Sequence, residues 1–295
     1  MPLNSPIHSH TDDRNKTGTL YVVATPIGNR EDITMRAIRV LKEANWIAAE
    51  DTRHTRRFLS GFGIPGRFLA YHEYNERKQT PVLIDKMKAG KSVALVSKAG
   101  TPSVSDPGFR LIKAAVESRI DVVPIPGVSA PLAALSASGL PSDSFVFVGF
   151  LPKKKGEKNK RLHEVSGEKR TLIFFESPNR IISFLEEIQT IMGDRNSVLC
   201  RELTKLHEEI LRGPVSQVAQ ALKDRPEIKG ECTLLIEGCG EKEEIRQEDL
   251  QREIEEEMKK TDLGISDIAR TIARRCGLSR RDVYEIAVKI KNERK

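Results

Sequence analysis

Four loops rich in glycine, proline and charged residues follow short apolar segments in this 295-residue sequence. They read TPIGN (25–29), AEDTRHTRR (49–57), SKAGTPSVSDPG (97–108) and PIPGVSA (124–130). Glycine lets a backbone approach a ligand closely, carboxylates can take a proton, and Arg can hold an anion. Ligands of open α/β sheets bind beyond the carboxyl ends of the strands. We therefore expect the loops to line one ligand cleft, the alternative being ordinary connections.

The second loop is the densest in reactive side chains. Glu50 and Asp51 are candidates for a base or an orienting carboxylate, and Arg53 for a group that holds an anion. The alternative is a solvated helix start, where acids complement the positive helix end and arginines form surface pairs. Because the segment follows a buried strand, we favour the functional interpretation.

The elements that position these loops alternate between strand and helix. Val93 to Val96 are apolar on both faces, which is typical of a buried parallel strand. Strands are predicted over 19–24, 46–49, 68–71, 93–96 and 121–125, and helices over 34–44, 54–62, 80–89 and 109–117. The alternation, without hairpin dipeptides, predicts a parallel sheet with crossover helices over residues 18–127.

A small-residue helix over 129–139 leads into a second half of similar kind. Strands are predicted over 145–149, 171–175, 197–201 and 232–237, and helices over 179–192 and 215–222. The segment FFESPNR (174–180) again places polar residues after a strand. The fold class is therefore α/β with two domains, the second spanning 128–240 with a mixed sheet.

Composition narrows the class of protein. The chain is 38% hydrophobic and 31% charged, and no apolar run is long enough for a membrane span. Residues 1–17 are polar, so we expect a disordered tail and no secretory signal. The four cysteines lack metal-ligand spacing, which favours reduced thiols in a cytoplasmic protein without a metal. A net charge of +7 is consistent with a polyanionic partner.

The charge is unevenly distributed. KKKGEKNKR (153–161) is strongly basic, and could be a flexible loop that grips phosphates or a solubilising loop. Residues 241–261 are acidic and are predicted to be a solvated linker. Residues 262–295 form a basic module in which helices over 266–276 and 280–291 flank GLS. This pattern resembles a helix-turn-helix, a generic helical hairpin being the alternative.

Several motifs, in order along the chain, resemble one known family. YVVATPIGNREDIT, AAEDTRHTRRFL, YHEYNER, SKAGTPSVSDPGFRLI, PIPGVSAPLAALSASG, TLIFFESPNRI and CRELTKLHEEILRG are similar to the tetrapyrrole-methylase-fold proteins, and among these to ribosomal RNA methyltransferases. The resemblance covers about residues 18–238 and extends to the terminal helical segment. It implies S-adenosylmethionine bound between two α/β domains of a homodimer. It also implies methyl transfer to the 2′-hydroxyl of a cytidine in the decoding region of 16S rRNA.

The matching motifs carry candidate site residues with them. The cofactor contacts implied by the resemblance are Pro26, Gly28, Gly100, Thr101, Ser105, Asp106, Pro126, Gly127, Ser129, Ala130, Phe150, Leu151, Glu202, Gly230 and Glu231. The basic residues expected to hold RNA, in a complex with 16S rRNA or the 30S subunit, are Lys153, Lys154, Lys155, Lys158, Lys160, Arg161, Arg274, Arg275, Arg280 and Arg281.

Two positions depart from the family pattern. Lys98 stands where the family has Asp before AGTP, and Val128 replaces the proline of PIPGPSA. We expect Lys98 to tune the cofactor pocket by pairing with Asp106 or a nearby acid, without abolishing binding. No acidic role is carried over to this position.

The expected reaction needs alignment of the ribose oxygen with an electrophilic methyl group, helped by a base. Asp51 or Glu50 is the predicted base, and Arg53 is expected to stabilise the developing oxyanion and hold RNA phosphate. Two alternatives remain: methylation of a small tetrapyrrole of the precorrin type, and RNA binding without catalysis if Lys98 abolishes cofactor binding. The basic segments argue against the first.

Overall fold

The computed structural model describes residues 17–240, 247–261, 264–276 and 280–293, without the side chains of 247–249, 274–276, 280 and 292–293. The chain divides into two compact units, residues 1–237 and 238–295. The predicted disordered tail (1–17) and the tripeptide GLS therefore lie outside the described residues, apart from Thr17. None of the described helices has the length and hydropathy of a membrane-spanning segment.

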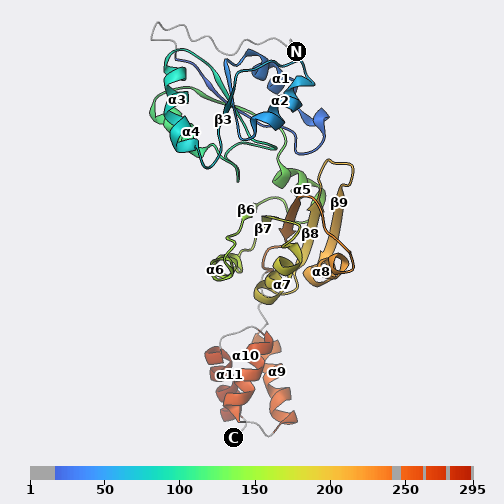
Figure 1. Ribbon diagram of the computed structural model, residues 1–295. Helices are drawn as coiled ribbons and strands as arrows, with labels where there is room; N and C mark the ends of the chain where they lie inside the picture. Colours follow the sequence, from blue (N-terminus) through green and yellow to red (C-terminus); the bar gives the residue numbers. More distant parts are fainter. Residues whose placement is uncertain (1–16, 241–246, 262–263, 277–279, 294–295) are drawn as a thin grey trace, which may run out of the picture. The chain divides into compact units, whose positions relative to one another are not determined.

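The first unit contains two sheets (Figure 1). The strands of the first sheet are β1 (Leu20–Val23), β2 (Trp46–Ala49), β3 (Phe68–Ala70), β4 (Val93–Val96) and β5 (Val122–Ile125). Its helices are α1 (Met35–Glu43), α2 (Thr52–Ser60), α3 (Glu76–Lys88) and α4 (Phe109–Glu117), with a short 3₁₀ turn over Arg30–Asp32. All pairings are parallel, as the sequence predicts, and the strand order is β3-β2-β4-β1-β5.

The position of the ligand cleft follows from this order. The neighbouring strands β1 and β4 lead into helices that cover opposite faces of the sheet. Leu41 of α1 belongs to the core on one face, and Leu111 of α4 to the core on the other. The two connections therefore diverge beyond the strand ends and leave a crevice there.

The second sheet is mixed, also as predicted. Its strands are β6 (Phe145–Phe150), β7 (Thr171–Glu176), β8 (Asn196–Arg201), β9 (Glu209–Pro214) and β10 (Cys232–Ile236). Its helices are α5 (Ala130–Ser138), α6 (Lys155–Val165), α7 (Ile181–Met192) and α8 (Val215–Lys223). The order is β6-β7-β10-β8-β9, where β6 is parallel to β7 and the other pairs are antiparallel.

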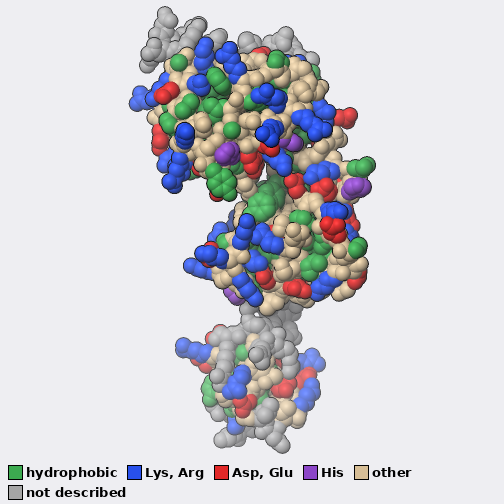
Figure 2. All heavy atoms as spheres, in the orientation of Figure 1, with side chains coloured by type: hydrophobic (Ala, Val, Ile, Leu, Met, Phe, Trp, Pro, Cys, Tyr) green, Lys and Arg blue, Asp and Glu red, His purple; other side chains and the backbone are tan. Residues whose placement is uncertain are grey.

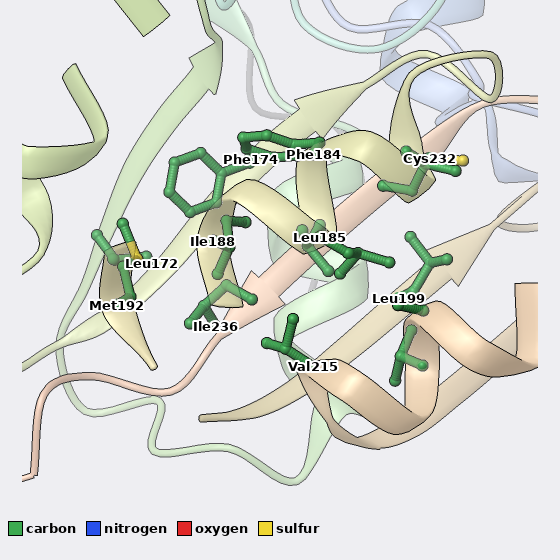
Figure 3. Close-up of a cluster of buried hydrophobic side chains, with 14 of the residues drawn as sticks. Leu172, Phe174, Phe184, Leu185, Ile188, Met192, Leu199, Val215, Cys232 and Ile236 are labelled. Atoms are coloured by element: carbon green, nitrogen blue, oxygen red, sulfur yellow. The ribbon is translucent and has the colours of Figure 1, made fainter. Parts of the chain in front are cut away.

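The core of this half lies between the sheet and helices α7 and α8 (Figure 3). Phe174 of β7 meets Phe184 of α7 edge to face, with ring centroids 5.5 Å apart. Leu185 and Ile188 continue the apolar face of α7, because residues three and four apart lie on one side of a helix.

The second unit consists, in its described part, of α9 (Gln247–Lys260), α10 (Ile265–Cys276) and α11 (Arg280–Glu293). Leu250 and Ile254, one helical turn apart on α9, are buried in one core with Ile268, Ile272 and Val283. The predicted acidic linker therefore differs from the structure over 247–260. Of the described acids of this helix, Glu256 is exposed and Glu253, Glu255 and Glu257 are half-buried, while its apolar side is buried.

Candidate functional site

Hydrogen bonds between the strand-end loops hold the crevice in shape. The backbone N–H groups of Thr25 and Gly100 each donate to the carbonyl oxygen of the other, at 2.9 Å. The Thr101 hydroxyl donates to the Val128 carbonyl at 3.3 Å, which ties the third loop to the fourth. The backbone N–H of Lys98 donates to Glu50 Oε2 at 3.3 Å, so all four loops predicted to share one cleft are joined by hydrogen bonds.

The second half closes the crevice from the other side. The backbone N–H of Asn29 donates to the Thr204 hydroxyl at 2.9 Å. A bulge in β6 places Gly149 at φ +72°, and a Cβ there would lie 2.8 Å from the Ser105 hydroxyl oxygen. Glycine is therefore required where β6 passes the loop after β4.

Backbone strain concentrates at the same place. Ser103 and Ser105 have φ values of 67° and 61°, and Glu202 and Thr204 have φ values of 52° and 64°. Such left-handed conformations are unfavourable for residues with a Cβ and are enriched at functional sites. Here they turn two loops, one from each half, toward the crevice.

A cavity of about 370 Å³ lies between these loops, which we name the donor cavity. The predicted residues that line it are Glu50, Gly100, Thr101, Ser105, Asp106, Ser129, Ala130, Phe150, Gly230 and Glu231. Lys98 is its one basic lining residue among those described. Phe150 and Phe175 supply apolar rings from β6 and β7, 5.4 Å between centroids.

The carboxylates make the donor cavity acidic. Burial raises the pKa of Asp106 to about 6; Ser97 opposes this, and the carboxylates of Glu50 and Glu231 add to it. Glu176 also lines the cavity but is paired with Arg180. Burial raises the pKa of Cys232 to about 12, so this lining thiol is neutral at pH 7. The cavity suits a ligand with positive charge and an apolar part.

A second cavity of about 500 Å³ adjoins the first, and we name it the basic cavity. Ile27, Lys98, Ala99 and Glu231 line both cavities. Pro26 and Gly28, predicted to touch the cofactor, line the basic cavity and not the donor cavity. Its other polar lining residues are Thr25, Arg30, His54, Arg57 and Lys205.

Comparison with known proteins agrees with this architecture. The family model of the Tetrapyrrole (Corrin/Porphyrin) Methylases matches residues 19–219. The chain belongs to this family. It is 49% identical over 231 residues, 78% of this chain and 80% of the relative, to the "Ribosomal RNA small subunit methyltransferase I" of Halalkalibacterium halodurans. It is 40% identical to the protein of that name from Micromonospora olivasterospora, over 96% of this chain and 90% of the relative.

A solved structure shares the fold. The uroporphyrin-III C-methyltransferase from Thermus thermophilus, complexed with S-adenosyl homocysteine, superposes with a TM-score of 0.54 at 20% identity. The alignment covers 75% of this chain and 97% of that one. This similarity supports the two-sheet architecture of the family member described above.

The three predicted catalytic residues, Glu50, Asp51 and Arg53, lie in different surroundings. Glu50 lines the donor cavity, and its Oε2 accepts the backbone N–H of Lys98 at 3.3 Å. Asp51 instead caps α2, where its Oδ1 accepts the N–H groups of Arg53 and His54. The His54 N–H, above all, lowers the pKa of the Asp51 carboxyl. Because Asp51 and Arg53 line neither cavity, the prediction that they act in the reaction lacks structural support.

Other predicted contacts lie outside both cavities. Leu151 is buried in the core of the second half, and Glu202 accepts the Lys205 ammonium and the Glu231 N–H. Pro126 and Gly127 are exposed, and a Cβ on Gly127 would lie 3.0 Å from that of Ala24. Gly127 therefore serves the close packing of its loop on the end of β1.

Lys98 differs from expectation. Its side chain is exposed, and no ion pair joins it to Asp106 or to any other acid in the described ranges. The contact to Glu50 is made by the backbone N–H and not by the ammonium. The charge of Lys98 is therefore available to both cavities.

The basic segment KKKGEKNKR is not a loop, because residues 155–165 form α6. Lys158 is buried and pairs with Glu187 at 2.6 Å, which excludes it from RNA contact. Lys154 pairs with Glu157 and Arg161 with Glu164. The exposed lysines without an ion pair to a described residue are Lys153, Lys155 and Lys160; Figure 2 shows Lys and Arg side chains over α6.

The terminal candidates are only partly visible. Arg281 is exposed and pairs with Glu285 at 3.1 Å. The side chains of Arg274, Arg275 and Arg280 lie outside the described residues. In the described ranges, no group of His, Cys, Asp or Glu has the arrangement of a metal site.

Sequence reasoning missed several lining residues. They are Ile27, Ala99, Val104, Pro131, Phe175, Glu176, Ser177, Pro178, Leu203, Cys232 and Thr233. The strand-end segment FFESPNR marked four of these as neighbours of a site. Ile27, Ala99 and Val104 lie in two of the loops predicted to line the cleft. The remaining four, Pro131, Leu203, Cys232 and Thr233, are small or apolar and carry no chemical signal of their own.

Proposed function

We propose that the chain transfers a methyl group from S-adenosylmethionine to ribosomal RNA. The observation that carries the proposal is the acidic, partly aromatic donor cavity beyond β1 and β4, with a basic cavity beside it. The names of the relatives, which are 40% and 49% identical, support ribosomal RNA as the substrate. The S-adenosyl homocysteine in a protein of the same fold supports the donor.

The residues of the donor cavity fit S-adenosylmethionine. Its volume of about 370 Å³ lies in the range of small-molecule sites. Phe150 and Phe175 would cover the adenine, since aromatic rings stack on flat apolar groups. Asp106 and Glu231 would face the sulfonium and ammonium charges. The start of α5 at Ala130 would suit the carboxylate of the methionine part.

The bound donor would supply an electrophilic methyl group, so the protein has to orient the acceptor and remove its proton. Glu50 is the carboxylate placed for this, because it lines the donor cavity next to Lys98. Lys98 would oppose the negative charge that develops on the acceptor oxygen. We further infer that the acceptor is the 2′-hydroxyl of a cytidine in the decoding region of 16S rRNA.

The acceptor is tested with tritiated S-adenosylmethionine and four acceptors: free 16S rRNA, 30S subunits, a precorrin-type tetrapyrrole and transfer RNA. Label in 16S rRNA or in 30S subunits supports the proposal and separates the two forms of the substrate. Label in the tetrapyrrole alone refutes it. Calorimetric titration with unlabelled donor identifies a protein that binds no donor, which would leave RNA binding without catalysis.

The homodimer implied by the resemblance stays a prediction. Sedimentation equilibrium distinguishes the mass of one chain from that of two.

A further inference from the structure

The basic cavity carries positive charge that no ion pair within the described part of the chain fully neutralises. The charged side chains of Arg30, Arg57 and Lys98 line it beside the His54 imidazole, and none of the four has an ion pair to a described residue. The fifth basic group, Lys205, is held by Glu202 at 2.7 Å and Glu231 at 3.1 Å. Like charges that face one cavity repel each other, so an anion bound there would relieve a real cost.

Part of this cluster is held in place before any ligand binds. The Arg30 guanidinium lies over the rings of Phe58 and Phe62, at 5.9 and 5.3 Å from their centroids. It also donates to the Phe58 carbonyl at 3.4 Å. These contacts fix the side chain without neutralising it, which lowers the entropic cost of binding an anion.

The location of the cluster points to the kind of anion. The cavity opens against the donor cavity through Ile27, Lys98, Ala99 and Glu231, which line both. A ribose presented to the donor cavity in an RNA chain is flanked by a phosphate on each side. Those phosphates must lie close to the wall that the two cavities share, which holds Lys98 and borders the arginines of the basic cavity.

We propose that the basic cavity binds the RNA phosphates next to the acceptor ribose, through Arg30, Arg57 and Lys98. This proposal rests on the proposed function and assigns a substrate site that neither α6 nor the terminal helices provide. Arg is suited to the role because its planar group holds phosphate oxygens in pairs. Lys98, at the shared wall, holds the phosphate nearest the acceptor.

Helix α2 offers a matched pair of variants for the test. Arg57 lines the basic cavity, whereas its neighbour Arg56 lies over the Phe68 ring at 4.9 Å and lines neither cavity. Arg57→Gln and Arg56→Gln remove the same charge from adjacent positions. A difference between them therefore reports the place of the charge and not the net charge of the protein.

The measurements are KM for 30S subunits at several salt concentrations and the dissociation constant of S-adenosylmethionine. Arg57→Gln is expected to raise KM about tenfold and to reduce the salt slope by about one. Its donor affinity and thermal midpoint should match those of Arg56→Gln, whose KM should stay near wild type. Equal KM values in the two variants would overturn the proposal.

Lys98→Met gives a second, independent readout. Removal of a cation from the shared wall should weaken RNA binding and strengthen binding of the positively charged donor. If the affinities for RNA and for the donor both rise or both fall, the assignment is contradicted.

If inorganic phosphate competes with 30S subunits but Arg57→Gln leaves KM unchanged, the cavity is a small-anion site and the proposal is wrong.

Failure of the proposed function would look different. Wild-type protein would then transfer no methyl group to 16S rRNA or 30S subunits. Filter binding of a short single-stranded RNA to the wild type and both arginine variants would still test the cavity. Weaker binding by Arg57→Gln alone supports an RNA phosphate site, and identical binding by all three refutes it.

Discussion

The donor cavity and the basic cavity are built from the same loops and differ in the sign of their charge. Glu50, Asp106 and Glu231 give the first its charge, and Arg30 and Arg57 the second. The loops over 25–29, 49–57 and 97–108 contribute to both; in the second of these, Glu50 precedes α2 while His54 and Arg57 lie three residues apart on one face of that helix. The start of one helix can thus present a carboxylate to a cationic donor on one side and basic side chains to an anionic acceptor on the other.

The largest expected effect is a loss of methyl-transfer rate, caused by a substitution in the donor cavity. Glu50→Gln keeps the size of the side chain and removes its capacity to accept a proton. If Glu50 is the base, single-turnover methyl transfer should fall about 100-fold, because general bases contribute on that order. S-adenosylmethionine affinity, measured in parallel, should change far less. A rate close to wild type would exclude Glu50 as the base.

The pH dependence of S-adenosylmethionine binding tests the role of the carboxylates in the donor cavity. With a pKa of about 6, Asp106 is ionised at pH 7.5 and gains a proton as the pH falls through 6. S-adenosylmethionine should therefore bind more weakly at pH 5 than at pH 7.5, by about tenfold if the carboxylate contacts its charge. Titration calorimetry at both pH values measures this.

Asp106→Asn is the control for that titration. It should bind the donor weakly at both pH values, because the amide does not titrate in this range. A variant with the same pH dependence as wild type would show that another group is responsible.

Charge reversal at Lys98, in the wall that the two cavities share, should change the affinity for S-adenosylmethionine by a smaller factor. Lys98→Asp adds an anion beside a cavity that suits a cation, and the exposed side chain moderates its influence. We expect S-adenosylmethionine to bind about threefold to tenfold more tightly. A gain of roughly 100-fold, about 2.7 kcal/mol, would instead mean that Lys98 strongly impairs the natural site.

The smallest effect concerns stability and separates Asp51 from its neighbour Glu50. Because Asp51 caps α2, Asp51→Ala should lower the free energy of unfolding, and Asp51→Asn should lower it by less. Chemical denaturation measures both. Methyl transfer by folded Asp51→Asn should stay near wild type. A large loss of rate in that variant would restore Asp51 as a catalytic candidate.

Most of the fold follows from the sequence because its strands are continuous apolar runs. β2 (Trp46–Ala49) and β4 (Val93–Val96) begin and end at the predicted residues. The sequence does not predict β9 (Glu209–Pro214), since this half-exposed edge strand is polar. It predicts a loop and a linker in place of α6 and α9 because charge dominates their composition, although Leu162 and Ile254 bury one face of each helix.

The site was harder to predict than the fold. Loop sequences showed which segments meet, but not which side chains enter a cavity. That choice depends on backbone turns such as the left-handed Ser103 and Ser105, which carry no sequence signal comparable to glycine. Two adjacent carboxylates that the sequence treats alike also have different roles: Glu50 lines the donor cavity, whereas Asp51 caps a helix.

In the proposed reaction, a methyl group passes from S-adenosylmethionine in the donor cavity to an RNA ribose whose neighbouring phosphates lie in the basic cavity. The most direct test incubates wild-type protein with labelled S-adenosylmethionine and unmethylated 30S subunits, then digests the RNA to nucleosides. We expect label in a single nucleoside, 2′-O-methylcytidine. Label on a base, or none in the RNA despite measured donor binding, would contradict it.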